Sequence, residues 1–130
     1  MKNPSRFTFG SKIIFLVATF LMSQTLIAAP QKTMQCTMQG MKDTLSFVVS
    51  NKTGDMPTID FPYPIDTIIF HQSSDTLLLV AMDHDEHSRP RVFISAQSSK
   101  KSHVYRGQFM TDFGGNQIQL DSGWVSCQPI

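Results

Sequence analysis

The chain has little of what marks an enzyme or a nucleic-acid-binding protein. Its 130 residues contain no Gly-x-Ser-x-Gly nucleophile motif, no glycine-rich phosphate loop and no His-Glu-x-x-His zinc motif. Charged residues make up 16% of the sequence and the formal net charge is +1, so a broad basic surface for a phosphate backbone is not expected. These absences predict a protein that is not an enzyme, carries no cofactor and binds no nucleic acid.

Cysteine is also scarce, with only Cys36 and Cys127 in the whole chain. Their wide separation excludes the close Cys-x-x-Cys spacing that redox-active and copper-binding sites use. In an exported chain, two cysteines predict one disulfide. A bridge between these two would close a loop of nearly the whole domain, for which chain-entropy arguments allow about 4–5 kcal/mol of stabilisation.

The N-terminal segment has the pattern of a secretory signal. Three basic residues precede an uncharged apolar run, residues 13–27, and a small-residue site follows at Ala28. We therefore expect a signal peptide over residues 1–28, cleaved after Ala28, and a single exported domain over residues 29–130 that is periplasmic or secreted. An uncleaved membrane anchor is the alternative, but the polar residues 23–25 make a poor membrane helix. With a cleaved signal peptide, the protein would contact the membrane only through that leader, during export.

The expected domain keeps eight of the eleven basic residues and all ten acidic ones, a formal charge of −2. Its sequence alternates apolar and polar residues in short runs between turn residues, which is the pattern of antiparallel strands. The run 77–82 is apolar without a break and would also suit a short helix, but the hairpin rhythm on both sides favours a strand. The expected strands are 33–39, 44–50, 65–71, 76–82, 91–97, 104–111 and 117–127. The predicted fold class is all-β, a small antiparallel meander of about seven to eight strands closing as a barrel or sandwich and stapled by one disulfide.

The C-terminal hairpin carries the most detailed expectations. Gly114-Gly115-Asn116 supplies residues that tolerate positive φ and is predicted to form the turn. Because the apolar phase slips late in the return strand, Gly123 is a candidate β-bulge that would turn Val125 and Cys127 inward. The side chains expected on the inward face of the hairpin are His103, Tyr105, Phe109, Thr111, Phe113, Ile118 and Leu120.

The sharpest candidate site is a run of potential metal ligands in the loop before the strand 91–97. Imidazole and carboxylate groups suit zinc, copper or nickel, and metal sites usually draw their ligands from several elements. His71 and His103, both on the expected inward phase of their strands, are the candidates for additional ligands. The alternative is a polar loop that simply faces water. The candidate ligands within the loop are Asp83, His84, Asp85 and His87.

Two apolar groups also have alternative readings. Met34, Met38 and Met41, with Cys36 among them, resemble a thioether cluster for Cu(I), but the alternation explains Met34 and Met38 as core side chains without a metal, so core packing is favoured. The aromatic side chains would either line a pocket for a hydrophobic ligand or fill a small core. The aromatic residues concerned are Phe47, Phe70, Tyr105, Phe109, Phe113 and Trp124.

These patterns lead to one leading hypothesis and two alternatives for function. The leading hypothesis is a small exported, non-enzymatic binding or inhibitor-type protein that contacts a protein partner in the cell envelope through its loops. The first alternative is a periplasmic metal-binding protein that uses the Asp83–His87 loop. The second is a carrier of a small hydrophobic ligand.

Overall fold

The architecture comes from a computed structural model that describes residues 32–52, 54–99 and 101–130. The expected signal peptide, residues 1–28, lies outside the described residues, and its cleavage after Ala28 stays a prediction. Among the residues that the structure describes, no helix has the length and apolar character needed to cross a membrane.

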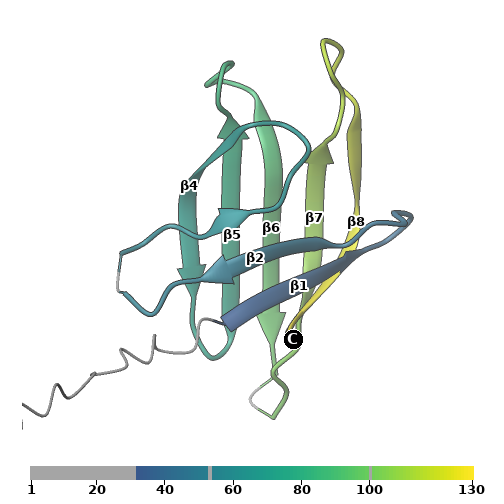
Figure 1. The fold of residues 1–130 in the computed structure, drawn as a ribbon. Helices are drawn as coiled ribbons and strands as arrows, with labels where there is room; N and C mark the ends of the chain where they lie inside the picture. Colours follow the sequence, from purple (N-terminus) through teal and green to yellow (C-terminus); the bar gives the residue numbers. More distant parts are fainter. Residues whose placement is uncertain (1–31, 53, 100) are drawn as a thin grey trace, which may run out of the picture.

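The described chain forms a single sheet of eight antiparallel strands connected as a meander (Figure 1). The strands in chain order are β1 (Lys32–Met38), β2 (Leu45–Val49), β3 (Thr58–Ile59), β4 (Ile65–Gln72), β5 (Thr76–Asp83), β6 (Pro90–Ser98), β7 (Tyr105–Asp112) and β8 (Leu120–Pro129). Their order across the sheet is β3-β2-β1-β8-β7-β6-β5-β4. The first strand therefore pairs with the last, and the sheet curls into a nearly closed barrel. The predicted all-β fold class is confirmed.

The barrel comes together where β3 and β4, the two edges of the sheet, contact each other. Thr67 Oγ1 on β4 donates a hydrogen bond to the carbonyl oxygen of Pro57, just before β3, at 3.0 Å. The short β3 is an additional strand that was not among those expected from the sequence. Prolines at 57, 62 and 64 cannot donate to a strand ladder, which limits the pairing available at this edge.

The inward face of the barrel is filled by apolar side chains at alternate positions of the strands. Leu77, Leu79 and Ala81 are fully buried while their neighbours on β5 are half-buried, so the run 77–82 is a strand and not a helix. The buried apolar core consists of Met34, Cys36, Met38, Leu45, Phe47, Ile59, Leu77, Leu79, Ala81, Val92, Ile94, Ala96, Tyr105, Phe109, Val125 and Cys127. Met41, Phe70 and Phe113 pack against this core from partly buried positions.

The predicted disulfide is confirmed. Cys36 on β1 and Cys127 on β8 are bonded to each other and lie directly opposite in the register of the two strands. They are 91 residues apart in the sequence, so the bond ties the first strand of the sheet to the last. A disulfide of this kind is typical of a non-reducing compartment.

The last strand differs from its predicted phase. Ile118 and Leu120, expected to face inward, are 67% and 59% exposed. The pairing of β7 with β8 runs without a shift from Tyr105 opposite Cys127 to Asp112 opposite Leu120, so Gly123 forms no β-bulge. Because Cys127 fixes the phase, the inward positions of β8 are the odd-numbered ones, and the apolar character of residues 118 and 120 gave the wrong face.

Three further expectations about side chains and turns were wrong. His71 and His103 are exposed and do not lie in the core. Trp124, grouped with the interior aromatic residues, is 66% exposed on the outward phase of β8. Positive φ occurs, among the described residues, only at Gly40 and Gly54, so the residues 114–116 belong to a longer loop over 113–119 and not to a tight hairpin turn.

Candidate functional site

Four loops gather at one end of the barrel. Because the meander alternates direction, the connections β1–β2 (39–44), β3–β4 (60–64), β5–β6 (84–89) and β7–β8 (113–119) all leave the sheet at the same end. Figure 1 shows the β5–β6 and β7–β8 connections rising side by side at the top of the view. We call this end the loop end of the barrel. The opposite end carries the β2–β3, β4–β5 and β6–β7 connections.

Arg89 and Asp112 form a buried ion pair that closes the β7–β8 loop. Arg89 Nε lies 2.6 Å from Asp112 Oδ2, and Arg89 Nη2 donates to Asp112 Oδ1 at 3.1 Å. The guanidinium also donates to the carbonyl oxygens of Gly114, Gly115 and Gln117. Only 7% of Arg89 and 1% of Asp112 is exposed, so the loop folds over the pair and shields it from water.

The carboxylate of Asp112 receives two further hydrogen bonds from the same loop. The backbone N–H groups of Gly114 and Gln119 both donate to Asp112 Oδ1 at 3.0 Å. A β-carbon on Gly114 would come within 1.9 Å of the carbonyl oxygen of Gln117, so only glycine permits this close approach. Hydrogen bonding to Arg89 first, and then to the two backbone N–H groups, holds the pKa of Asp112 well below its ordinary value.

A second buried pair, Arg91 with Asp83, joins the β5–β6 loop to the same cluster. Arg91 Nε lies 2.7 Å from Asp83 Oδ2, while Arg91 Nη1 donates to the carbonyl oxygens of Asp112 and Gly114. Arg91 is the extra residue where the pairing of β5 with β6 shifts. A bulge of this kind re-aims a side chain, and here it allows a residue at the start of β6 to reach across to the β7–β8 loop.

Asp83 also organises the start of its own loop. Its Oδ1 accepts hydrogen bonds from the backbone N–H groups of Asp85 and Glu86, each at 2.9 Å. The Glu86 N–H is the main cause, and Arg91 the second, of a pKa of Asp83 lowered to about 2. We call the side chains of Asp83, Arg89, Arg91 and Asp112 the buried ionic cluster. They are joined by ion pairs, and each has hydrogen-bond partners.

The buried ionic cluster extends to the β3–β4 loop through aromatic rings. The guanidinium carbon of Arg91 lies 4.5 Å from the centre of the Tyr63 ring, a cation–π contact. Phe61, two residues earlier, stacks on Phe113 with ring centres 4.7 Å apart. Three of the four loops at this end are thus held together by contacts among buried or half-buried side chains.

An open pocket lies beside these contacts, with a cavity volume of about 520 Å³. We call it the loop-end pocket. Its apolar surface comes from Met38, Met41, Leu45, Phe61, Pro62 and Phe113, and its polar residues are Asp43, Thr44, Asp60, Gln119 and Asp121. The stacked rings of Phe61 and Phe113 form part of its wall. The backbone N–H of Gln119 donates a hydrogen bond to Asp112. The buried ionic cluster therefore fixes the β7–β8 loop, which supplies Phe113 and Gln119 to the loop-end pocket.

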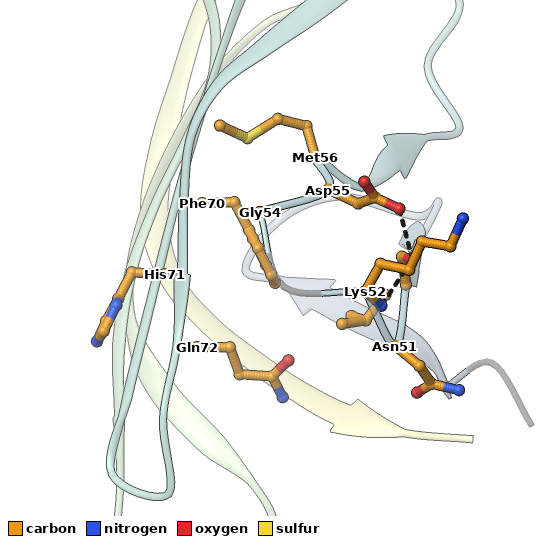
Figure 2. A pocket seen from close by; sticks show the side chains of 10 residues that line it. Asn51, Lys52, Gly54, Asp55, Met56, Phe70, His71 and Gln72 are labelled. Carbon is orange, nitrogen blue, oxygen red and sulfur yellow. Dashed lines mark hydrogen bonds between the residues drawn. The ribbon is translucent and has the colours of Figure 1, made fainter. Parts of the chain in front are cut away.

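A second pocket, of about 340 Å³, lies at the opposite end between the β2–β3 loop and β4 (Figure 2). Ser50 Oγ donates to Asp55 Oδ2 at 2.9 Å and accepts from the backbone N–H of Lys52 at 3.1 Å. Figure 2 shows His71 pointing away from this loop, on the opposite side of β4 from Phe70. The outward direction of His71 follows from the alternation of β4, since Phe70 is the inward-facing neighbour.

The predicted metal ligands do not form one convergent group. Asp83 is buried against Arg91, whereas His84, Asp85 and His87 are exposed. His84 Nδ1 lies 2.8 Å from Asp66 Oδ2, and this contact raises the pKa of His84 above its ordinary value. The rings of His84 and His87 are neighbours, with centres 6.5 Å apart. Within the described ranges, no group of three or more His, Cys, Asp or Glu residues is placed to hold a metal ion; metal binding by this loop stays a prediction.

The methionine cluster takes part in packing. Met34 and Met38 are buried in the core, Cys36 is in the disulfide, and Met41 Sδ accepts a hydrogen bond from Thr111 Oγ1 at 3.8 Å. These contacts match the core-packing reading of the methionines.

The buried ionic cluster is not predicted by the sequence pattern. No candidate site expected from the sequence included Asp112, Arg89 or Arg91. Two signals were present: a carboxylate immediately before Phe113-Gly114-Gly115, and two arginines at the boundary of an acidic loop and an apolar strand. Neither signal identifies its partner, because Arg89 and Asp112 are 23 residues apart.

No family model, curated protein or solved structure matches this chain. Functional interpretation therefore depends on the geometry of the site.

Proposed function

We propose that this protein is a small exported, non-enzymatic binding or inhibitor-type protein that contacts a protein partner in the cell envelope through the loop end of its barrel. The observation that carries the proposal is the buried ionic cluster, which holds the β5–β6 and β7–β8 loops and, through Tyr63, the β3–β4 loop. Loops that are fixed before binding lose little conformational entropy when a partner docks on them. Rigid loops around an open pocket are suited to recognition.

Two further observations support this proposal. The Cys36–Cys127 disulfide is typical of proteins in oxidising compartments such as the periplasm or the exterior of the cell. The barrel interior is occupied by the side chains of the apolar core, and the loop-end pocket opens at the surface. A surface-binding role therefore accounts for this arrangement more directly than the carriage of a hydrophobic ligand inside the barrel.

The test compares one substitution at each end of the barrel. Asn116→Arg places a bulky cation at the exposed tip of the β7–β8 loop, and Ser74→Arg places the same group at the exposed turn between β4 and β5. Purified wild-type protein is immobilised and exposed to the periplasmic and secreted fractions of its host. The captured protein is then measured for binding to each variant by surface plasmon resonance.

We expect wild type and Ser74→Arg to bind the partner equally. Asn116→Arg should bind at least roughly tenfold more weakly, a loss of about 1.4 kcal/mol, because the added side chain clashes with the docked partner. Failure to capture any protein would overturn the proposal. The reverse pattern, with Ser74→Arg impaired and Asn116→Arg unchanged, would also overturn it, because it would place the contact at the other end.

A further inference from the structure

The loop-end pocket combines an apolar surface with carboxylates that have no counter-charge. Asp43, Asp60 and Asp121 line the cavity, and no lysine, arginine or histidine lines it with them. Across the described ranges of the chain, none of these three carboxylates takes part in an ion pair or a side-chain hydrogen bond. The pocket is thus a local region of negative charge.

The nearest arginines do not neutralise that charge. Arg89 and Arg91 belong to the same end of the barrel, but their guanidinium groups are bonded to Asp112 and Asp83 and to carbonyl oxygens of the β7–β8 loop. Each positive charge of the buried ionic cluster therefore has its own carboxylate. Among the residues that line the loop-end pocket, the three carboxylates therefore have no positive partner.

The apolar part of the pocket favours one kind of cation over others. Phe61 and Phe113 present a stacked pair of half-buried rings, and Met41 lies at the cavity from the β1–β2 turn. Aromatic faces attract organic cations, and long basic side chains lay their methylene stems on apolar surface while the charged head stays in a polar environment. The cavity of about 520 Å³ lies within the roughly 300–1,000 Å³ range of ligand pockets.

We propose that the loop-end pocket receives a lysine or arginine side chain of the protein partner, with the alkyl stem on Met41, Phe61 and Phe113 and the cation among Asp43, Asp60 and Asp121. The charge complementarity specifies a basic partner surface. A hard metal ion fits the pocket less well, because the carboxylates come from separate segments around an apolar surface and a metal requires converging oxygen ligands. This inference rests on the proposed function, since it names the chemistry of the group that docks at the loop end.

The first test uses small probes and needs no partner. Wild-type protein labelled with ¹⁵N is titrated at low salt with n-butylguanidinium and n-hexylammonium chloride, and separately with n-hexanol as the uncharged probe. We expect saturable amide shifts confined to the loops around the pocket for both cations, weaker or no shifts with hexanol, and loss of the cation shifts at high salt.

Variants identify the residues that carry this binding. The triple variant Asp43→Asn/Asp60→Asn/Asp121→Asn removes the charges while keeping side-chain size, and Asp85→Asn removes an exposed carboxylate of the same end that does not line the cavity. The triple variant should bind the cations at least roughly tenfold more weakly, because it lacks the three negative charges that attract them. Asp85→Asn should match wild type. Should the triple variant fail to fold by circular dichroism, Asp60→Asn alone replaces it.

The outcomes separate this inference from the proposed function. Equal binding of hexanol and the cations would make the pocket an apolar-ligand site and overturn the inference. The inference would also be overturned if neither cation produced localised amide shifts. If the partner is captured and lost on Asn116→Arg but binds the triple variant as tightly as wild type, the proposed function stands and this inference fails. Failure to capture a partner overturns the proposed function, whatever the probes show.

Discussion

The buried ionic cluster makes a quantitative prediction for the variant Asp112→Ala. The substitution removes the carboxylate that accepts from Arg89, Gly114 and Gln119. It leaves a guanidinium buried without its main counter-charge and two backbone N–H groups without their acceptor. Removing one partner of a buried ion pair costs about 3–5 kcal/mol of unfolding free energy, so we expect a loss in that range.

The loss is large compared with the whole stability of a domain this size. Small domains have unfolding free energies of about 5–15 kcal/mol, and a loss of about 4 kcal/mol lowers Tm by roughly 15–30 °C. The assay is urea denaturation followed by far-ultraviolet circular dichroism, with the disulfide intact. A fall in the urea midpoint with an unchanged m-value would show that the folded state itself is destabilised.

Two additional variants make the reasoning refutable. Asp85→Ala removes an exposed carboxylate from the β5–β6 loop and should change the unfolding free energy by no more than about 0.5 kcal/mol. Adding Arg89→Met to Asp112→Ala should restore part of the lost stability, because it removes the uncompensated charge. If Asp112→Ala costs less than about 1 kcal/mol, the buried pair does not hold this end of the barrel together.

Three more predictions follow from other contacts. The pKa of Asp83 is lowered from 3.8 to about 2, so the ionised carboxylate contributes fully to the unfolding free energy above about pH 4 and loses this contribution as the pH falls towards 2. The urea midpoint of the wild-type protein should therefore drop between about pH 4 and pH 2, and it should drop less in Asp83→Asn. Gly107→Ala should strongly lower the unfolding free energy, because the added β-carbon would lie 2.0 Å from a backbone oxygen of β6. Gly123→Ala should lower it little in the same urea titration, because its β-carbon would meet mainly a flexible glutamine side chain. Replacing Cys36 and Cys127 together by alanine should lower the unfolding free energy by about 2–5 kcal/mol, and an unchanged urea midpoint would contradict this estimate.

The strand pattern was predictable from local sequence because burial in a sheet repeats every second residue. Met34, Cys36 and Met38 alternate with polar residues and are all buried, as are Ile94 and Ala96 on either side of Ser95 on β6. The alternation and the turn residues between the runs were sufficient to give the all-β class and every strand except the short β3. The pair Cys36–Cys127 then required the first and last strands to meet.

The last strand shows where local pattern loses its power. Leu120 is apolar, but the face of the sheet on which it lies is determined by Cys127, seven residues later. The two residues lie on opposite faces because β8 runs without a bulge between them. An apolar side chain on the outward face of an antiparallel strand gives the same local signal as one on the inward face. Long-range pairing, which the local pattern does not contain, decided between the two faces.

The buried ionic cluster was unpredictable for a related reason. The reach of Arg91 depends on a bulge in the pairing of β5 with β6, and a bulge is a property of two strands together. Asp112 is buried only because the β7–β8 loop folds back over it. Charged residues at strand ends are usually solvated, so composition alone favours the exposed alternative.

The disulfide between neighbouring first and last strands has a consequence for proteolysis. Residues 36–127 form a covalent ring, and every loop of the barrel lies inside it. A single cut by a protease in any of these loops, which are the usual sites of nicking, opens the ring without releasing a fragment. The two pieces stay joined through Cys36 and Cys127, and the sheet between them keeps its pairings. In a compartment rich in proteases, a clipped molecule would keep its original mass apart from one added water, and its cleavage would become visible only after reduction.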